Sequence, residues 1–450
     1  MFPPGPKGGR LLGSLPEIRR DPLAFLTRVG AEYGDIARFR LGPFQVFLLN
    51  HPDDIEQVLV TCHHRFIKGR SLSGARRLFG RGLLTSDGAQ HARQRRLVQP
   101  AFHRVRLNAY AGIMTALAVE RRDAWHDGDV VDIGGEMSRL TLAITSQILF
   151  GADGDAVAAE IGGALEAAAS LREVALLPFP ALDLVPLPRV RRFRAARATI
   201  DRVVYDCIAR RRRDGGAGDD VLSLLLSAHD ESDGGGMSDR QLRDEVVTLL
   251  LASHETTANA LTWTWYLLGR HAEAAARLEA EIDAVLAGRL PTAADVADLP
   301  FARMVLAESM RLYPPAWLLA RIAVDDHEAR GYIVPKGSLV VLSPWVAHRN
   351  SKHFPEPERF DPDRWCAARA SGRPRFSYFP FGGGSRGCMG EAFAWMEGVL
   401  VLAVFARRWR CQLLDPASHP GMRPALTLTP KSGIRVRVQQ RPSEARPGRR

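Results

Sequence analysis

The residues with the clearest chemical potential surround a cysteine near the C-terminal end of the chain. The segment 379–390 reads Phe-Pro-Phe-Gly-Gly-Gly-Ser-Arg-Gly-Cys-Met-Gly, and the apolar stretch after it predicts a helix over 390–407. Free N–H groups and the positive end of that helix dipole would face the Cys388 sulfur and favour its thiolate. Thiolate is the form that ligates a metal, so Cys388 is a candidate ligand rather than an ordinary buried cysteine.

The residues around Cys388 indicate what the metal-bearing ligand is. Glycines let a backbone approach a flat ligand closely. Phe381 can pack against that ligand and keep water from the sulfur, and Arg386 can pair with one of its carboxylates. Haem is planar, carries iron and has two propionates, so it fits these features. The glycines also match G-x-G-x-x-G, but Pro380 precedes them and residues 407–410 are basic, which argues against a dinucleotide site.

The segment 381–390 resembles the signature of the cytochrome P450 family, F-x-x-G-x-R-x-C-x-G. Its fixed positions are matched by Phe381, Gly384, Arg386, Cys388 and Gly390. The resemblance extends from about residue 2 to residue 438. It implies a mainly α fold with a minor antiparallel β-sheet region. One domain would enclose haem b (iron protoporphyrin IX), with the Cys388 thiolate as axial ligand.

A second match is the motif E-x-x-R, formed by Glu308 and Arg311. Residues three apart share a helix face and can pair, although such a pair alone is most often a solvated ion pair. In the family this pair binds an arginine from the irregular segment before the cysteine loop. Because 357–360 resembles that segment, Arg359 is the expected third member, with a structural role.

The third match lies at 252–257, which reads Ala-Ser-His-Glu-Thr-Thr and resembles the family's oxygen-activation motif, [AG]-G-x-[DE]-T-[TS]. A hydroxyl beside an acid makes a short proton path through water, so Glu255 and Thr256 are the expected catalytic residues. Thr256 can also bond to a backbone carbonyl and open a groove, with Ala252 beside the haem. Ser253 replaces the usual glycine, and His254 is expected to lie off the haem-facing stripe.

Four basic residues occupy positions at which the family grips the haem propionates. His91 and Arg95 lie four apart, Arg321 follows Arg311 by ten residues, and Arg386 lies in the cysteine loop. Alone, each is as well explained as a solvated charge. Together they supply donors for two carboxylates.

Helices must position these residues. Apolar periodicity predicts helices over 90–102, 238–268 and 301–312, besides 390–407. Ser238, with Gln241 three residues on, predicts a capping box for the longest of these helices. The Gly- and Asp-rich stretch 214–236 is expected to be a surface loop. The absence of βαβ alternation makes a parallel-sheet enzyme improbable.

The resemblance implies a monooxygenase that inserts one atom of O2 into a small hydrophobic molecule, expected to be a terpenoid, steroid or fatty acid. Its pocket is expected to draw on 65–85, 176–188, the helix near Leu251, 316–319 and a turn near Leu428. Electrons are expected from a separate ferredoxin or flavodoxin with its reductase, with Arg93 and Arg96 as candidate docking residues. Two alternatives stay open, a haem-thiolate enzyme that uses or isomerises peroxide and a haem-binding sensor or carrier without turnover.

Composition excludes several other classes of protein. The 450 residues are 46% hydrophobic and 25% charged, as in ordinary globular chains. The net charge of +11 comes from scattered arginines without a nucleic-acid-binding motif. The five cysteines lack C-x-x-C spacing, which excludes a disulfide framework and a zinc or iron–sulfur site. No apolar run reaches the roughly 18 residues of a membrane span. We therefore expect a cytoplasmic monomer, with one haem domain over 1–440 and a basic, disordered tail over 441–450.

Overall fold

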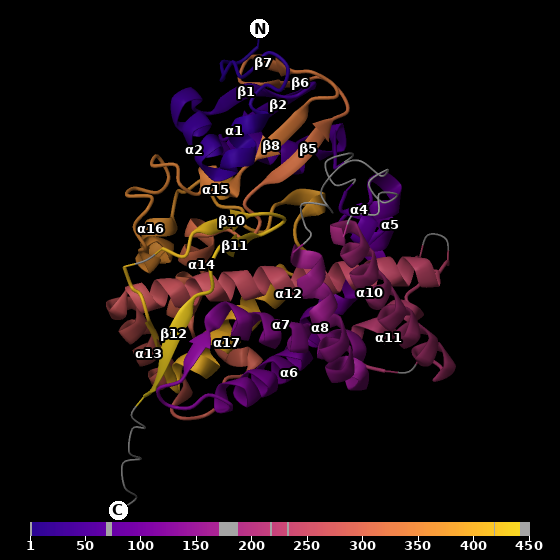
Figure 1. Cartoon of the computed structure of the whole chain (residues 1–450), viewed down its shortest axis with the longest axis vertical. Helices are drawn as coiled ribbons and strands as arrows, with labels where there is room; N and C mark the ends of the chain where they lie inside the picture. The colour runs from indigo at the N-terminus through magenta and orange to yellow at the C-terminus, as the bar shows by residue number, and fades with distance from the viewer. Residues whose placement is uncertain are drawn as a thin grey trace, which may run out of the picture.

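A long helix crosses the middle of the molecule. The structure is a computed structural model, and it describes residues 2–68, 74–170, 188–216, 218–231, 234–417 and 419–441. The central helix is α12, and most other helices lie around it (Figure 1). The described helices are α1 (Leu15–Arg20), α2 (Pro22–Tyr33), α3 (Pro52–Glu56), α4 (Arg76–Phe79), α5 (Gly88–Val98), α6 (Arg104–Asp123), α7 (Ile133–Phe150), α8 (Gly154–Ser170), α10 (Pro188–Arg213), α11 (Val221–Ser227), α12 (Asp239–Arg270), α13 (Ala272–Leu286), α14 (Pro300–Leu312), α15 (Pro344–Ala347), α16 (Ala367–Ala370) and α17 (Glu391–Ala406).

The strands form small sheets at the periphery. The largest sheet has the order β1-β2-β8-β5-β3 and lies toward the N-terminal end of the molecule (Figure 1). Its neighbouring strands are antiparallel except for β2 and β8, which are parallel. The other sheets are β4-β12-β9, β10-β11 and β6-β7. The strands are β1 (Ile36–Leu41), β2 (Phe44–Leu49), β3 (Phe66–Ile67), β4 (Val130–Asp132), β5 (Leu319–Ala323), β6 (His327–Ala329), β7 (Tyr332–Val334), β8 (Leu339–Leu342), β9 (Trp409–Leu413), β10 (Met422–Pro424), β11 (Leu428–Pro430) and β12 (Arg435–Gln440).

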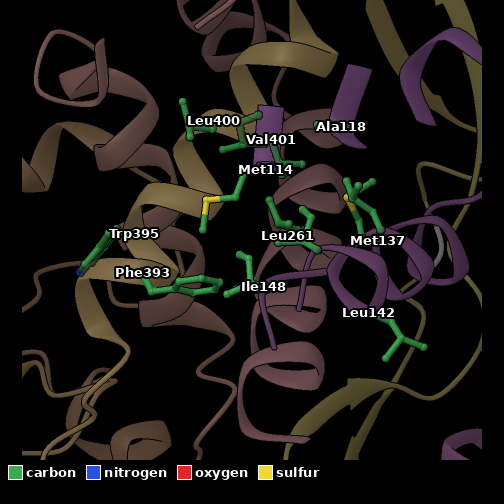
Figure 2. Close-up of a cluster of buried hydrophobic side chains, with 14 of the residues drawn as sticks. Met114, Ala118, Met137, Leu142, Ile148, Leu261, Phe393, Trp395, Leu400 and Val401 are labelled. Atoms are coloured by element: carbon green, nitrogen blue, oxygen red, sulfur yellow. The ribbon is translucent and has the colours of Figure 1, made fainter. Parts of the chain in front are cut away.

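The main core holds α12 against its neighbours. Figure 2 shows buried side chains gathered from several helices, among them Met114 of α6, Met137 of α7, Leu261 of α12 and Val401 of α17. Burying one such side chain contributes about 1.5–3 kcal/mol. The cluster therefore fixes the position of α12 relative to α17, the two helices that carry or follow the motifs at 252–257 and 381–390.

One expectation about local structure is wrong. The stretch 214–236, expected to be a loop, contains the helix α11. The Asp220 side chain accepts a hydrogen bond from Ser223 N and caps this helix, and Leu222 and Leu225 are buried. The glycines on both sides of this short helix favoured the prediction of a loop over that of a helix.

In the described part of the chain, no helix combines the length and apolarity needed to cross a membrane.

Candidate active site

Cys388 lies in a tight loop that leads directly into α17. Backbone hydrogen bonds close the loop, from Cys388 N to the Phe381 carbonyl (2.9 Å) and from Gly387 N to the Gly384 carbonyl (3.0 Å). The N–H of Gly390, which precedes α17, donates to the Cys388 sulfur. The sulfur therefore faces the amino end of a helix, where unpaired N–H groups favour negative charge.

The Cys388 side chain is both accessible and surrounded by protein. The residue is exposed, yet burial raises the pKa of its thiol to about 11, while the Gly390 N–H and Arg95 act in the opposite direction. A thiol that binds a metal loses its proton because the cation replaces it. Phe381 packs against Trp395 of α17 with ring centroids 5.6 Å apart, beside the sulfur-bearing loop.

Two glycines of the signature have different steric surroundings. Gly384 has φ +63°, and a Cβ built there would lie 1.9 Å from the Leu59 carbonyl oxygen. Only glycine fits at this position. Gly390 has φ −85°, and its Cβ would make an ordinary contact of 3.6 Å with Phe102. Gly384 is therefore required by the protein fold itself, whereas the protein alone leaves room for a side chain at Gly390.

The four basic side chains expected at the propionates converge from three elements. Burial, and then Arg386, lower the pKa of His91 to about 3 and that of Arg321 to about 10. Arg95, one turn after His91 on α5, donates from Nη1 to the Gly387 carbonyl at 2.9 Å. The mutual influence of these groups shows that they lie close together.

Lys68 and Asp87 also belong to this cluster, and sequence reasoning missed both. The Lys68 Nζ donates to the Leu84 carbonyl at 2.9 Å, and Asp87 accepts from Lys68 N (3.0 Å) and from Arg386 Nη2 (2.7 Å). Burial lowers the pKa of Lys68 well below its usual value, and Arg321 and Arg386 lower it further. A signal was present, because Lys68 is one of only five lysines in an arginine-rich chain.

The cluster fits an anionic ligand. Its contacts include one carboxylate, Asp87, against several cations, and Arg386 Nη1 is buried without a hydrogen-bond partner in the part of the chain that the structure describes. Buried cations are stable when paired. A ligand with two carboxylates, such as haem, would add negative charge beside these cations.

The motif on α12 places its hydroxyl groups along the helix. The Thr256 hydroxyl donates to the Ala252 carbonyl at 2.6 Å, the backbone contact expected for a local groove. Ala252 is exposed, although α12 crosses the middle of the fold. Ser253 is directed elsewhere, because its hydroxyl donates to the Leu249 carbonyl (2.6 Å) and its oxygen lies 3.2 Å from the Thr145 hydroxyl of α7.

Glu255 and His254 lie on other faces of α12. The Glu255 carboxylate accepts a hydrogen bond from the hydroxyl of Thr427, in the turn between β10 and β11. The His254 Nε2 lies 3.1 Å from the Ser138 hydroxyl of α7. No set of three or more His, Cys, Asp or Glu side chains placed to hold a metal occurs among the described residues.

Glu308 and Arg311 form a buried pair. Neither side chain is exposed, and two hydrogen bonds of 2.8 Å join them. Arg311 Nη1 also donates to the carbonyls of His348 (3.0 Å) and Pro357 (2.6 Å). The pair therefore ties α14 to the irregular segment before the cysteine loop, and the alternative of a solvated ion pair is excluded.

The expectation that Arg359 completes this pair is wrong, because Arg364 does so. The Arg359 side chain is 62% exposed, and only its backbone carbonyl accepts from Arg311, at 3.0 Å. Arg364 is 2% exposed, and its Nε donates to Glu308 at 3.2 Å. The physical reason is the short 3₁₀ turn Pro362–Trp365, which directs the Arg364 side chain toward Glu308. The preceding segment contacts Arg311 through its backbone carbonyls instead.

A cavity of about 590 Å³ runs along the face of α12 that carries Glu255. Its apolar lining includes Leu78 and Phe79 of α4, Leu142 of α7 and Leu251 of α12. Three of the segments expected at a substrate pocket contribute to it, through Leu78 and Phe79, through Leu251, and through Leu426 and Thr429, whereas Leu142 comes from a helix not expected there. The expected segment 316–319 does not line it, and most of 176–188 lies outside the described residues.

Comparison with known proteins identifies the family. The sequence model of cytochrome P450 matches residues 3–437. Cyclooctatin synthase of Streptomyces melanosporofaciens is 43% identical over 430 residues, which cover 94% of this chain and 93% of that protein. Pentalenene oxygenase of Streptomyces avermitilis is 35% identical, with 95% of each chain covered.

Solved structures agree with this assignment. The haem domain of cytochrome P450DA superposes with a TM-score of 0.88 at 28% identity, covering 98% of both chains. The retinoic acid bound cyanobacterial CYP120A1 gives the same TM-score at 26% identity, covering 98% of this chain and 99% of that one. The chain therefore belongs to the cytochrome P450 family of haem-thiolate monooxygenases.

Proposed function

We propose that this protein hydroxylates a terpenoid, with haem b bound through Cys388 and electrons supplied by a separate ferredoxin or flavodoxin. The observation that carries the proposal is the exposed Cys388 at the amino end of α17, beside a cationic cluster in which Arg386 Nη1 is buried without a hydrogen-bond partner among the described residues. Haem bound through a thiolate activates O2 for insertion into a C–H bond.

Each element of the site has a defined task in this proposal. The Gly390 N–H stabilises the Cys388 thiolate, and Phe381 restricts water at the sulfur. Burial lowers the pKa of His91 to about 3 in the protein without a ligand, and its imidazole would still donate one N–H to a propionate. The neighbouring arginines, Arg95, Arg321 and Arg386, would hold the haem by pairing with its propionates.

The acid and the alcohol on α12 move protons. The Thr256 hydroxyl donates a hydrogen bond to the Ala252 carbonyl, one turn earlier on the helix. Glu255 precedes Thr256 in the sequence, lies on another face of α12 and lines the cavity. A carboxylate that connects to water can carry protons inward, and the Thr256 hydroxyl would supply a donor for the O2 chemistry of a bound haem.

The terpenoid class is supported by two independent facts. Two of the relatives named above act in terpenoid chemistry, and a third, the cyclooctat-9-en-7-ol 5-monooxygenase of Streptomyces melanosporofaciens, is 38% identical. The cavity along α12 has a mainly apolar lining and a volume of about 590 Å³. Such a space suits a compact hydrocarbon skeleton with few polar groups.

Arg93 and Arg96, the residues expected to dock a redox partner, make contacts within the protein. Arg96 forms an ion pair with Asp230 at 2.8 Å, and Arg93 lies 3.5 Å from the same carboxylate and donates to the Gly235 carbonyl. These contacts fasten α5 to the connection between α11 and α12. We therefore assign Arg93 and Arg96 a structural role.

Carbon monoxide binding to the reduced protein tests the haem site. We expect the red-shifted Soret band of thiolate-ligated haem, and its loss in Cys388→Ala, with Cys366→Ala as the matched control that keeps the band. Turnover of pentalenene and cyclooctat-9-en-7-ol is then compared between NADPH with a ferredoxin system and peroxide alone. A wild-type protein without the band contradicts haem-thiolate binding, and turnover with peroxide alone favours the peroxide-using alternative.

A further inference from the structure

The Glu255 carboxylate is held by a residue from the far end of the chain. Thr427 lies in the turn between β10 and β11, and its hydroxyl donates to Glu255 Oε1. Asn259, one turn after Glu255 on α12, donates from Nδ2 to the Thr427 hydroxyl at 3.1 Å. Thr427 and Asn259 are 5% and 8% exposed, so this chain of hydrogen bonds is sheltered from bulk water.

The direction of the chain is set by hydrogen-bond chemistry. A threonine hydroxyl has one hydrogen and two lone pairs. Because the Thr427 oxygen accepts from the Asn259 amide, its single hydrogen is directed at Glu255. Asn259 therefore orients the Thr427 hydroxyl, and this hydroxyl orients the carboxylate.

The turn that carries Thr427 is a fixed support. Trp263 Nε1 of α12 donates to the Leu428 carbonyl at 3.2 Å. Trp317 Nε1 donates to the Ala425 carbonyl at 2.9 Å, and Leu428 N donates to the Pro315 carbonyl at 3.0 Å. These contacts flank Thr427 on both sides, so its hydroxyl offers Glu255 a defined position.

The position of Glu255 separates it from the neighbouring alcohol. Thr256 donates its hydroxyl hydrogen to the Ala252 carbonyl, whereas Glu255 bonds to Thr427. Adjacent helical residues point about 100° apart, so the two side chains lie on different faces of α12. Glu255, Asn259 and the neighbouring Leu426 line the cavity of about 590 Å³.

We infer that Thr427 is a positioning residue for proton delivery, which holds the Glu255 carboxylate at the cavity side of α12, and that Asn259 orients its hydroxyl. The inference rests on the proposed monooxygenase function. Glu255 and Asn259 also line the cavity, so a substrate bound there would lie beside the same carboxylate.

The test compares Thr427→Val, which removes the donor at nearly constant shape, with Thr427→Ser, which keeps it. With pentalenene or cyclooctat-9-en-7-ol, whichever gives the larger Soret shift, we expect Thr427→Val to lower kcat about tenfold and to reduce the yield of product per NADPH. The solvent deuterium isotope effect on kcat should rise, while the dissociation constant from the Soret titration changes less than about twofold. Thr427→Ser should retain wild-type values, as should the exposed control Ser432→Ala.

A crystal structure of each variant gives a readout independent of turnover. In Thr427→Val the Glu255 carboxylate should leave the turn, and in Thr427→Ser it should stay. The inference is overturned if Thr427→Val keeps wild-type coupling and isotope effect, if its Glu255 carboxylate stays in place, or if Thr427→Ser loses activity as Thr427→Val does. Failure of the proposed function has a different signature, because the wild-type protein itself would then lack the thiolate Soret band.

Discussion

At the scale of single residues, the buried charges show which side chains the fold depends on. Glu308 receives hydrogen bonds from Arg311, from Arg364 and from Trp365 Nε1 at 3.0 Å. A buried carboxylate is tolerated only when such donors surround it. Arg359 lies five residues before Arg364 and has an exposed side chain, so the two arginines form a natural pair for comparison.

Replacing Arg364 by alanine should destabilise the protein far more than replacing Arg359. Removing one partner of a buried charge cluster costs about 3 kcal/mol or more, whereas loss of an exposed arginine costs less than about 0.5 kcal/mol. Denaturant unfolding followed by circular dichroism measures both, and haem content shows whether the proximal side stays intact. Similar losses of stability in the two variants would falsify the assignment of Arg364 as the third member of the cluster.

At the scale of elements, a buried acid faces the junction of α17 and α12. Glu397 of α17 is fully buried, and in the described structure neither of its oxygens makes a hydrogen bond of ordinary geometry. Burial raises the pKa of its carboxyl to about 8, although the Thr257 hydroxyl of α12 opposes this shift. The neutral acid is thus the form that fits between these helices.

The pH dependence of stability should carry the signature of Glu397. The pKa of its carboxyl is about 8 in the folded protein and 4.5 in the unfolded chain, so the folded state binds the proton more tightly. The resulting stability is fully present below pH 4.5 and is lost as the pH rises through about 8, by up to about 5 kcal/mol. Glu397→Gln cannot ionise there, so its unfolding free energy should fall less over this range than that of the wild type.

Thermal melting from pH 4.5 to pH 9 measures this difference, with the exposed Glu328→Gln as control. The control should follow the wild-type curve. Parallel curves for Glu397→Gln and the wild type would show that Glu397 is already ionised in the folded protein.

At the scale of the whole molecule, the cationic cluster links ligand binding to stability. Burial lowers the pKa values of Lys68 and Arg321, and the neighbouring charge of Arg386 lowers both further. A ligand that binds only the folded state stabilises that state, and here it also neutralises buried charge. Haem loading should therefore raise the melting temperature.

Lys68→Met should have opposite effects in the two forms of the protein. Without haem, removal of one buried cation should leave the melting temperature equal or higher. With haem, it removes a partner of a propionate, so the gain on loading should shrink. Scanning fluorimetry of the haem-free and reconstituted proteins measures both, with the exposed Lys352→Met as control. A uniform shift in both forms would exclude Lys68 from the haem site.

The sequence alone determined the features that depend on neighbouring residues. The loop 381–390, the capped start of α12 at Ser238 and the E-x-x-R pair are local patterns, and the structure contains the Ser238 cap and the Glu308–Arg311 pair. Helix periodicity and short spacing were enough to predict them, because these contacts form within one or two turns.

The tertiary structure decided the residues that act across the chain. Arg364 reaches Glu308 over 56 residues, Thr427 reaches Glu255 over 172, and Arg386 reaches Asp87 over 299. No local pattern encodes such contacts, since they exist only after the core around α12 and α17 has packed. Burial then decides which of several similar residues forms the contact, because a charge removed from water is stable only where the fold places a partner beside it.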